Sequence, residues 1–91
     1  MKRVHQRIVL GQRVRALRRS ARMSQEQLGE AASLYRTYIV RIESGAADPT
    51  LSVLLRLAQA LGVNVETLFG NNLEAAETQT QPEIPEPMSL D

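Results

Sequence analysis

The sequence contains no cysteine, which excludes disulfide bridges, thiolate zinc sites and cysteine nucleophiles. Aromatic side chains are scarce as well, with two tyrosines, one phenylalanine and no tryptophan. A hydrophobic core must therefore be built from Leu, Ile, Val and Ala, which favours small packed helices over a β-sandwich. With 91 residues the chain can form one small domain, and we expect its fold class to be all-α.

Long apolar runs and clustered metal ligands are missing too. The longest apolar run near the start, at residues 8–10, is too short for a signal peptide or a membrane span, so we expect a cytoplasmic protein without membrane contact. The single histidine, His5, lies in a basic leader, and the acidic pair Glu26 and Glu30 has no histidine or aspartate beside it. Because GxSxG, HExxH and phosphate-loop motifs are also absent, we expect no enzyme, no metal and no cofactor.

The net charge of +1 conceals a separation of charge along the chain. Residues 1–70 hold all eleven Lys and Arg against five acidic residues, which leaves +6, whereas residues 71–91 hold five acidic residues and no basic one. A basic domain attracts polyanions. Residues 71–91 also contain three prolines and lose apolar periodicity, so we expect a folded domain at 1–70 followed by a flexible acidic tail.

Apolar spacing predicts five helices before the tail. Their ends are marked by residues with capping preferences, including a capping box formed by Ser24 and Gln27, and by Gly45 and Asn64. The expected helices lie at about residues 4–21, between Ser24 and Ser33, at 36–43, between Thr50 and Gly62, and at 65–69. The apolar residues expected to face the core from the first three helices are Ile8, Leu10, Val14, Leu17, Leu28, Ala32, Ile39 and Ile42.

Residues 24–44, SQEQLGEAASLYRTYIVRIES, have the spacing of a helix-turn-helix. Two short helices that cross closely need a small residue in the first and a left-handed residue at the turn, and Gly29 and Ser33 occupy these positions. A serine in the left-handed region costs about 1 kcal/mol, so the turn should still form. Ile39 and Ile42 are expected to pack the second of these helices against the rest of the domain. The residues left facing outward are Arg36, Thr37, Val40 and Arg41, with Tyr38 at the margin.

Taken in order, these segments resemble the lambda-repressor/Cro-like helix-turn-helix regulators, the XRE family. The resemblance covers residues 10–69 and is carried by SQEQL, YIVRIESG, PTLSVLLRLAQALGV and NVETLF. The RTYI stretch resembles the controller proteins of restriction-modification systems. The family implies a compact five-helix domain that binds double-stranded DNA. The chain departs from the family pattern at Ser33, where glycine is common, at Tyr35, where Ser or Asp caps the helix, and at Val40.

The resemblance also implies roles for individual residues. The outward residues would read bases in the major groove, since an arginine can form two hydrogen bonds to guanine and a threonine can contact a thymine methyl. The plainer interpretation is an ordinary solvated helix face. The expected base-reading residues are Arg36, Thr37, Tyr38 and Arg41.

A second group is expected at the start of the second helix, where free backbone N–H groups favour a phosphate. The expected contacts with the DNA backbone are Gln25, Ser24 and Arg22, against the simpler interpretation of exposed polar residues. Glu43 lies in the last turn of its helix, where the helix dipole disfavours a carboxylate. The resemblance assigns Arg18 as its partner, in a structural ion pair.

We expect the protein to regulate transcription as a homodimer on a two-fold operator. Apolar residues of the fourth and fifth helices are candidates for the dimer interface, or else belong to the core: Leu55, Val63, Val65, Leu68 and Leu73. An alternative function is an antitoxin or adaptor that binds DNA for autoregulation. In that case a protein partner would bind the tail through Ile84, Met88 and Leu90.

Overall fold

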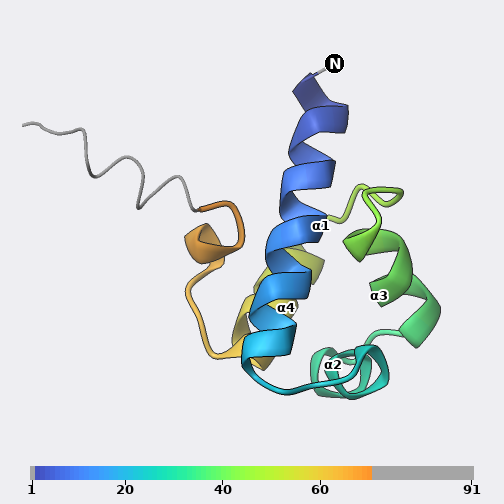
Figure 1. Cartoon of the computed structure of the whole chain (residues 1–91), viewed down its shortest axis with the longest axis vertical. Helices are drawn as coiled ribbons and strands as arrows, with labels where there is room; N and C mark the ends of the chain where they lie inside the picture. Colours follow the sequence, from blue (N-terminus) through green and yellow to red (C-terminus); the bar gives the residue numbers. More distant parts are fainter. Residues whose placement is uncertain (1, 71–91) are drawn as a thin grey trace, which may run out of the picture.

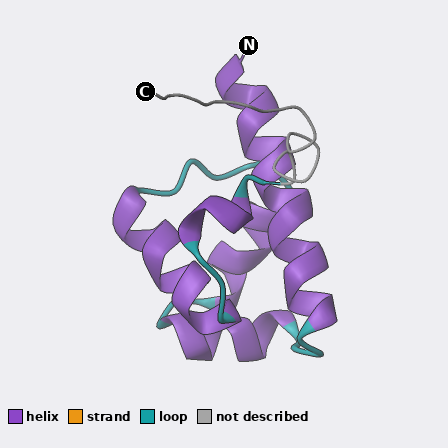
Figure 2. Cartoon of the chain, turned by 90° about the vertical axis from the view of Figure 1, so that its left-hand side faces the viewer, coloured by secondary structure: helices purple, strands orange, loops and turns teal. Residues whose placement is uncertain are grey.

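The computed structural model describes residues 2–70, and the side chains of residues 4–70. The described residues form helices joined by loops and turns and contain no strand (Figure 2). The predicted all-α class is therefore confirmed. The elements in chain order are α1 (Lys2–Ser20), α2 (Gln25–Ala32), α3 (Arg36–Glu43), α4 (Leu51–Leu61) and the 3-10 helix η1 (Val65–Leu68).

The expected fifth α-helix is a single 3-10 turn, so residues 2–70 contain four α-helices and not five. The backbone N–H of Thr67 donates to the carbonyl of Asn64 at 2.9 Å, and that of Phe69 donates to Glu66 at 3.1 Å. These hydrogen bonds join residues three apart, as in a 3-10 helix. They are favoured because so short a segment forms too few bonds to offset the free energy of nucleating an α-helix. Asn64 precedes the turn, but its side chain makes no capping bond.

Local capping follows the sequence prediction at both ends of α2 and of α4. Ser24 and Gln27 form both bonds of the capping box, and the Thr50 hydroxyl accepts from the backbone N–H of Val53. Ser33 ends α2 in the left-handed conformation with φ 59°, as expected of this turn. Gly62 ends α4 with φ 73°.

Arg22 adopts φ 60° after α1, and no feature of the sequence predicts a left-handed residue there. The backbone N–H of Met23 donates to the carbonyl of Arg18 at 3.0 Å, and that of Arg22 donates to Arg19 at 2.9 Å. This pair of bonds closes the end of α1 in a Schellman motif, whose left-handed position is usually glycine.

The core lies between the four α-helices and η1, all of which contribute side chains to it (Figure 1). Ile8, expected to join it, is 43% exposed. Ile8 lies against the turn at Gly45, where a Cβ atom added to the glycine would be 3.1 Å from its Cγ1. The rest of its side chain is exposed because the first turns of α1 project beyond the neighbouring elements (Figure 1). Each element contributes at least one almost fully enclosed side chain, as Leu10, Val14, Leu28, Ala32, Ile39, Ile42, Val53, Leu57, Ala58 and Leu68 show.

Candidate nucleic-acid interface

The turn between α2 and α3 brings the two helices into close contact. A Cβ atom added to Gly29 would lie 2.6 Å from the carbonyl oxygen of Leu34, so no larger side chain fits without a shift of backbone. The N–H of Leu34 donates to the carbonyl of Gly29 at 2.8 Å and fixes the chain as it leaves α2. The predicted helix-turn-helix geometry is therefore present at residues 24–44.

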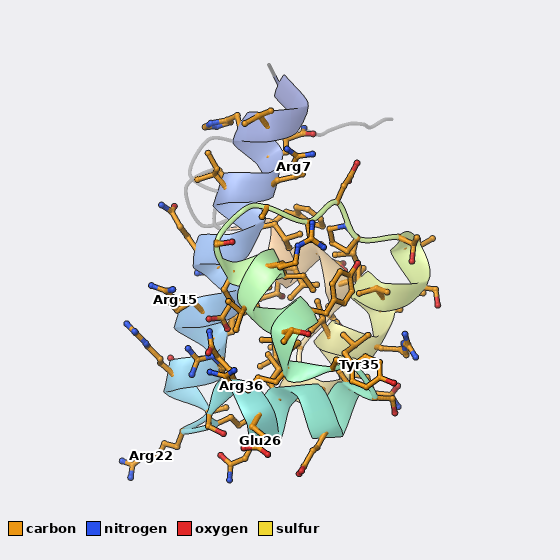
Figure 3. All side chains as sticks on the ribbon, turned by 90° about the vertical axis from the view of Figure 1, so that its right-hand side faces the viewer. Arg7, Arg15, Arg22, Glu26, Tyr35 and Arg36 are labelled. Atoms are coloured by element: carbon orange, nitrogen blue, oxygen red, sulfur yellow. The ribbon has the colours of Figure 1, made fainter. Side chains whose placement is uncertain are left out.

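Helix α3 buries one face and exposes the other (Figure 3). Ile39 and Ile42 are enclosed in the core, as predicted, and Tyr38 is half-buried against it. The base-reading role of the outward residues stays a prediction, but their side chains are accessible to a ligand. The exposed residues of this helix are Arg36, Thr37, Val40 and Arg41.

Arg41 also supports the loop that follows α3. Its Nη2 atom donates to the carbonyl oxygen of Ala46 at 3.2 Å, on the surface of the domain. The hydroxyl of Ser44 donates to the carbonyl of Arg41 at 3.1 Å. Gly45 then turns the chain with φ 84°. Because the Arg41 bond is exposed, its guanidinium can exchange this partner for another acceptor at little cost.

The carboxylate of Glu43 is the centre of a charged network between α1, α2 and α3. Arg18 donates from Nε to Oε2 at 2.6 Å and from Nη2 to Oε1 at 3.1 Å, which gives a bidentate pair. The Nη1 atom of Arg18 donates to the carbonyl of Met23 at 2.8 Å. The Glu43 side chain is fully enclosed, and the Arg18 side chain is 11% exposed. Arg18 therefore pairs with Glu43, as the resemblance implied.

Gln25 joins this network from the start of α2. Its Nε2 atom donates to Oε1 of Glu43 at 3.1 Å, and Arg15 places its Nε 3.5 Å from the same oxygen. Burial alone would raise the pKa of Glu43, but hydrogen bonds from Arg18 and Gln25 and the charge of Arg18 outweigh it. The pKa of Glu43 is therefore held below its ordinary value, and the carboxylate stays ionised at neutral pH.

The residues expected to contact the DNA backbone cluster around the start of α2. Gln25 is half-buried and already bonded to Glu43, so its amide is fixed in orientation. The Ser24 hydroxyl accepts from the N–H of Gln27 at 3.0 Å. Arg22 is exposed at the end of α1 (Figure 3). Contact of these groups with phosphate stays a prediction.

The predicted dimer-interface residues do not share one environment. Leu68 is fully buried in the core and is therefore not available to a second copy of the chain. Val63 and Val65 are partly buried and pack against the same core. Leu55 is 49% exposed and is the most open of the members that lie among the described residues. Leu73 and the proposed tail contacts, Ile84, Met88 and Leu90, lie outside the described residues.

Sequence reasoning missed two contacts of α1. A Cβ atom on Gly11 would lie 2.5 Å from the carbonyl oxygen of Ile42 and 2.6 Å from that of Glu43, so α1 and α3 touch backbone to backbone. On the other side of α1, Arg13 donates from Nε to the carbonyl of Thr67 at 3.0 Å. A glycine inside a helix, where it costs up to about 1 kcal/mol, was the signal for the first contact.

Neither a membrane-spanning helix nor a metal-binding cluster is found among the described residues. No helix among them is long and apolar enough to cross a membrane. Within the same part of the chain, no group of three or more His, Cys, Asp or Glu side chains is placed to hold a metal ion.

Two crossed short helices, the second exposing a polar face and packing on the longer α1 while the first packs on α4, define a helix-turn-helix domain. A family profile described as a helix-turn-helix domain matches residues 9–68. The chain therefore belongs to this family, and its relatives make it an XRE-like helix-turn-helix regulator.

Relatives from phage and restriction-modification systems support this assignment. The chain is 36% identical over 74 residues to the immunity repressor protein of Bacillus phage phi105, covering 81% of this chain and 51% of that protein. It is 43% identical over 61 residues to the control protein C.SmaI of Serratia marcescens, covering 67% of this chain and 73% of that protein. The chain thus spans about half the length of the phage repressor.

The fold has a counterpart among solved structures. The restriction-modification controller protein C.AhdI from Aeromonas hydrophila superposes with a TM-score of 0.68 and 36% sequence identity. The match covers 69% of this chain and 96% of that one. The predicted resemblance to restriction-modification controllers is therefore confirmed at the level of sequence and fold.

Proposed function

We propose that this protein is a sequence-specific transcriptional regulator that binds a two-fold DNA operator as a homodimer. The observation that carries the proposal is the exposed face of α3, which presents Arg36, Thr37 and Arg41 while Ile39 and Ile42 anchor the helix in the core. Arginine and threonine can distinguish base edges in the major groove, and a helix of this size fits that groove.

The network around Glu43 supports the same function because it fixes the orientation of the reading helix. Arg18 and Gln25 hold the last turn of α3 from α1 and from the start of α2. A reading helix held from two sides loses little conformational freedom when it binds. The basic balance of residues 1–70 adds attraction to a polyanion that does not depend on sequence.

The homodimer follows from the size of the site. One reading helix contacts too few base pairs to select one site among many, and two copies on a symmetric operator multiply the discrimination. Leu55, exposed on α4, is the best remaining candidate for a contact between copies. The relatives named as an immunity repressor and as control proteins support a regulatory role.

The proposal is tested by selecting bound sequences from a random DNA pool and footprinting the selected site. We expect an inverted repeat whose half-sites lie roughly 34–36 Å apart, the spacing of one helical turn of DNA. Sedimentation of the same preparation should give a dimer. Recovery of no enriched sequence, or protection of a single half-site by a monomer, would contradict the proposal.

A further inference from the structure

Two arginines of α1 approach the single carboxylate of Glu43, and they do so unequally. Arg18 occupies both carboxylate oxygens, at 2.6 and 3.1 Å, and its side chain is 11% exposed. Arg15 approaches only Oε1, at 3.5 Å, and its side chain is 47% exposed. One carboxylate balances one guanidinium, so the crossing keeps a surplus positive charge, and Arg15 carries it at the surface.

The position of Arg15 is set by the close crossing of α1 and α3. Gly11 lets the α1 backbone touch the carbonyls of Ile42 and Glu43, and Arg15 lies one helical turn further along the same edge. The next turn places Arg18 inside the crossing. Arg15 is therefore the outer member of this edge, next to the reading helix and not on the far side of α1.

The same edge faces the ligand side of α3. In the view onto α3, Arg15 on α1, Arg22 after α1 and Arg36 on α3 lie along one side of the molecule (Figure 3). Arg22 and Arg36 are exposed. A DNA strand that borders the groove entered by α3 would pass this side of the domain.

We propose that Arg15 binds a phosphate of the DNA backbone beside the groove occupied by α3, leaving Glu43 to Arg18 and Gln25. This inference rests on the proposed function, because the position of the strand follows from insertion of α3. Exchange of Glu43 for a phosphate as the partner of Arg15 is favourable. The exposed contact with Glu43 at 3.5 Å is weak, whereas a guanidinium bonds phosphate strongly and in a fixed geometry. Glu43 keeps its bidentate bond from Arg18 and the bond from Gln25.

Salt dependence distinguishes a phosphate contact from a purely structural role. Each phosphate contact makes the slope of log K against log salt concentration more negative by about 0.9, because binding releases counterions. Substitution of a residue that only supports the fold changes the stability of the domain and leaves this slope unaltered. We therefore propose to measure affinity for a random-sequence duplex of about 30 base pairs at several salt concentrations.

Three variants of the full-length chain make the comparison. Arg15→Gln removes the charge, and Arg15→Lys keeps it. Arg13→Gln is the matched control, since it removes one charge from the same helix but on the edge that bonds Thr67 of η1, away from α3 (Figure 1). Circular dichroism at the binding temperature establishes that each variant is folded.

We expect Arg15→Gln to reduce the magnitude of the salt slope by about one for each copy of the chain bound, and to weaken binding of all sequences by a similar factor. Arg15→Lys and Arg13→Gln should keep the slope of the unaltered protein. The melting midpoint should fall less in Arg15→Gln than in Arg18→Gln, because the Arg18 side chain is enclosed.

An unchanged slope in Arg15→Gln would overturn this inference while leaving the proposed function intact. An equal loss of slope in Arg13→Gln would also overturn it, because the effect would then come from overall charge. If the unaltered protein bound no duplex at all, the proposed function and this inference would both be wrong.

Discussion

Arg36 is the first residue of α3, and its side chain is exposed. Substituting it tests whether α3 reads bases or only attracts DNA by charge. We expect Arg36→Ala to weaken binding to the selected operator by roughly 1–3 kcal/mol more than binding to random DNA, because a base contact discriminates between sequences. The measurement is the affinity for both duplexes at one fixed salt concentration. Arg22→Ala serves as control, since loss of a phosphate contact should weaken both equally. Equal losses in Arg36→Ala would remove it from the base-reading set.

Ser33 holds a left-handed backbone conformation that glycine adopts without strain. We expect Ser33→Gly to stabilise the domain by about 1 kcal/mol, which raises the melting midpoint by roughly 4–8 °C for a domain of this size. Ser52→Gly is the matched control, because Ser52 lies exposed within α4 and glycine there should lower the midpoint. A lower midpoint for Ser33→Gly would show that the turn is stabilised by the serine side chain.

At the scale of elements, the crossing of α1 and α3 depends on the enclosed pair of Arg18 and Glu43. We expect Glu43→Gln and Arg18→Met each to destabilise the domain by about 3 kcal/mol, since each leaves a buried partner unpaired. The double variant should lose less than the sum of the two, because it leaves no charge stranded. Denaturant titration of the four proteins measures the coupling. Additive losses would mean that the two side chains act independently.

The same pair makes the crossing sensitive to acid. The pKa of Glu43 is lower in the folded protein than in the unfolded chain, because hydrogen bonds from Arg18 and Gln25 and the charge of Arg18 outweigh the effect of burial. Its contribution to stability is therefore fully present above the pKa of the unfolded chain and is lost as the pH falls through the folded pKa. The difference in melting midpoint between the unaltered protein and Glu43→Gln should be larger at pH 7 than at pH 3. A difference that stays constant over this range would contradict the assignment.

Elements whose signals are local could be predicted from the sequence, and those that depend on distant partners could not. The Ser24–Gln27 capping box and the turn at Ser33 are determined by residues close together in the sequence, so the sequence predicts both correctly. The left-handed Arg22 was not, because arginine carries no preference for that conformation. The exposure of Ile8 depends on where the neighbours of α1 end, which helical periodicity cannot show.

The candidate site was predictable to a similar degree. The outward positions of α3 followed from apolar spacing, because Ile39 and Ile42 fix which side of the helix is buried. The pairing of Arg18 with Glu43 needed the family resemblance, since several arginines of α1 could have reached the carboxylate. The bond from Gln25 to Glu43 joins residues far apart in sequence and has no local signal.

For the whole molecule, assembly is the property that the proposed function requires. We expect Leu55→Lys to keep its helical content, because Leu55 is 49% exposed, but to sediment with half the mass and to bind operator weakly and without cooperativity. Val4→Lys is the matched control, being a similarly exposed apolar residue on α1, and should leave the mass unchanged. A dimeric Leu55→Lys protein would place the contact between copies elsewhere.

The bond from Arg13 to Thr67 has a consequence for the order of folding. It joins positions 54 residues apart, whereas α2 and α3 meet across a turn of a few residues. The entropy lost on closing a loop grows with its length, so the helix-turn-helix pair should form early and docking of η1 on α1 should complete folding late. Arg13→Ala should then accelerate unfolding and leave the refolding rate nearly unchanged.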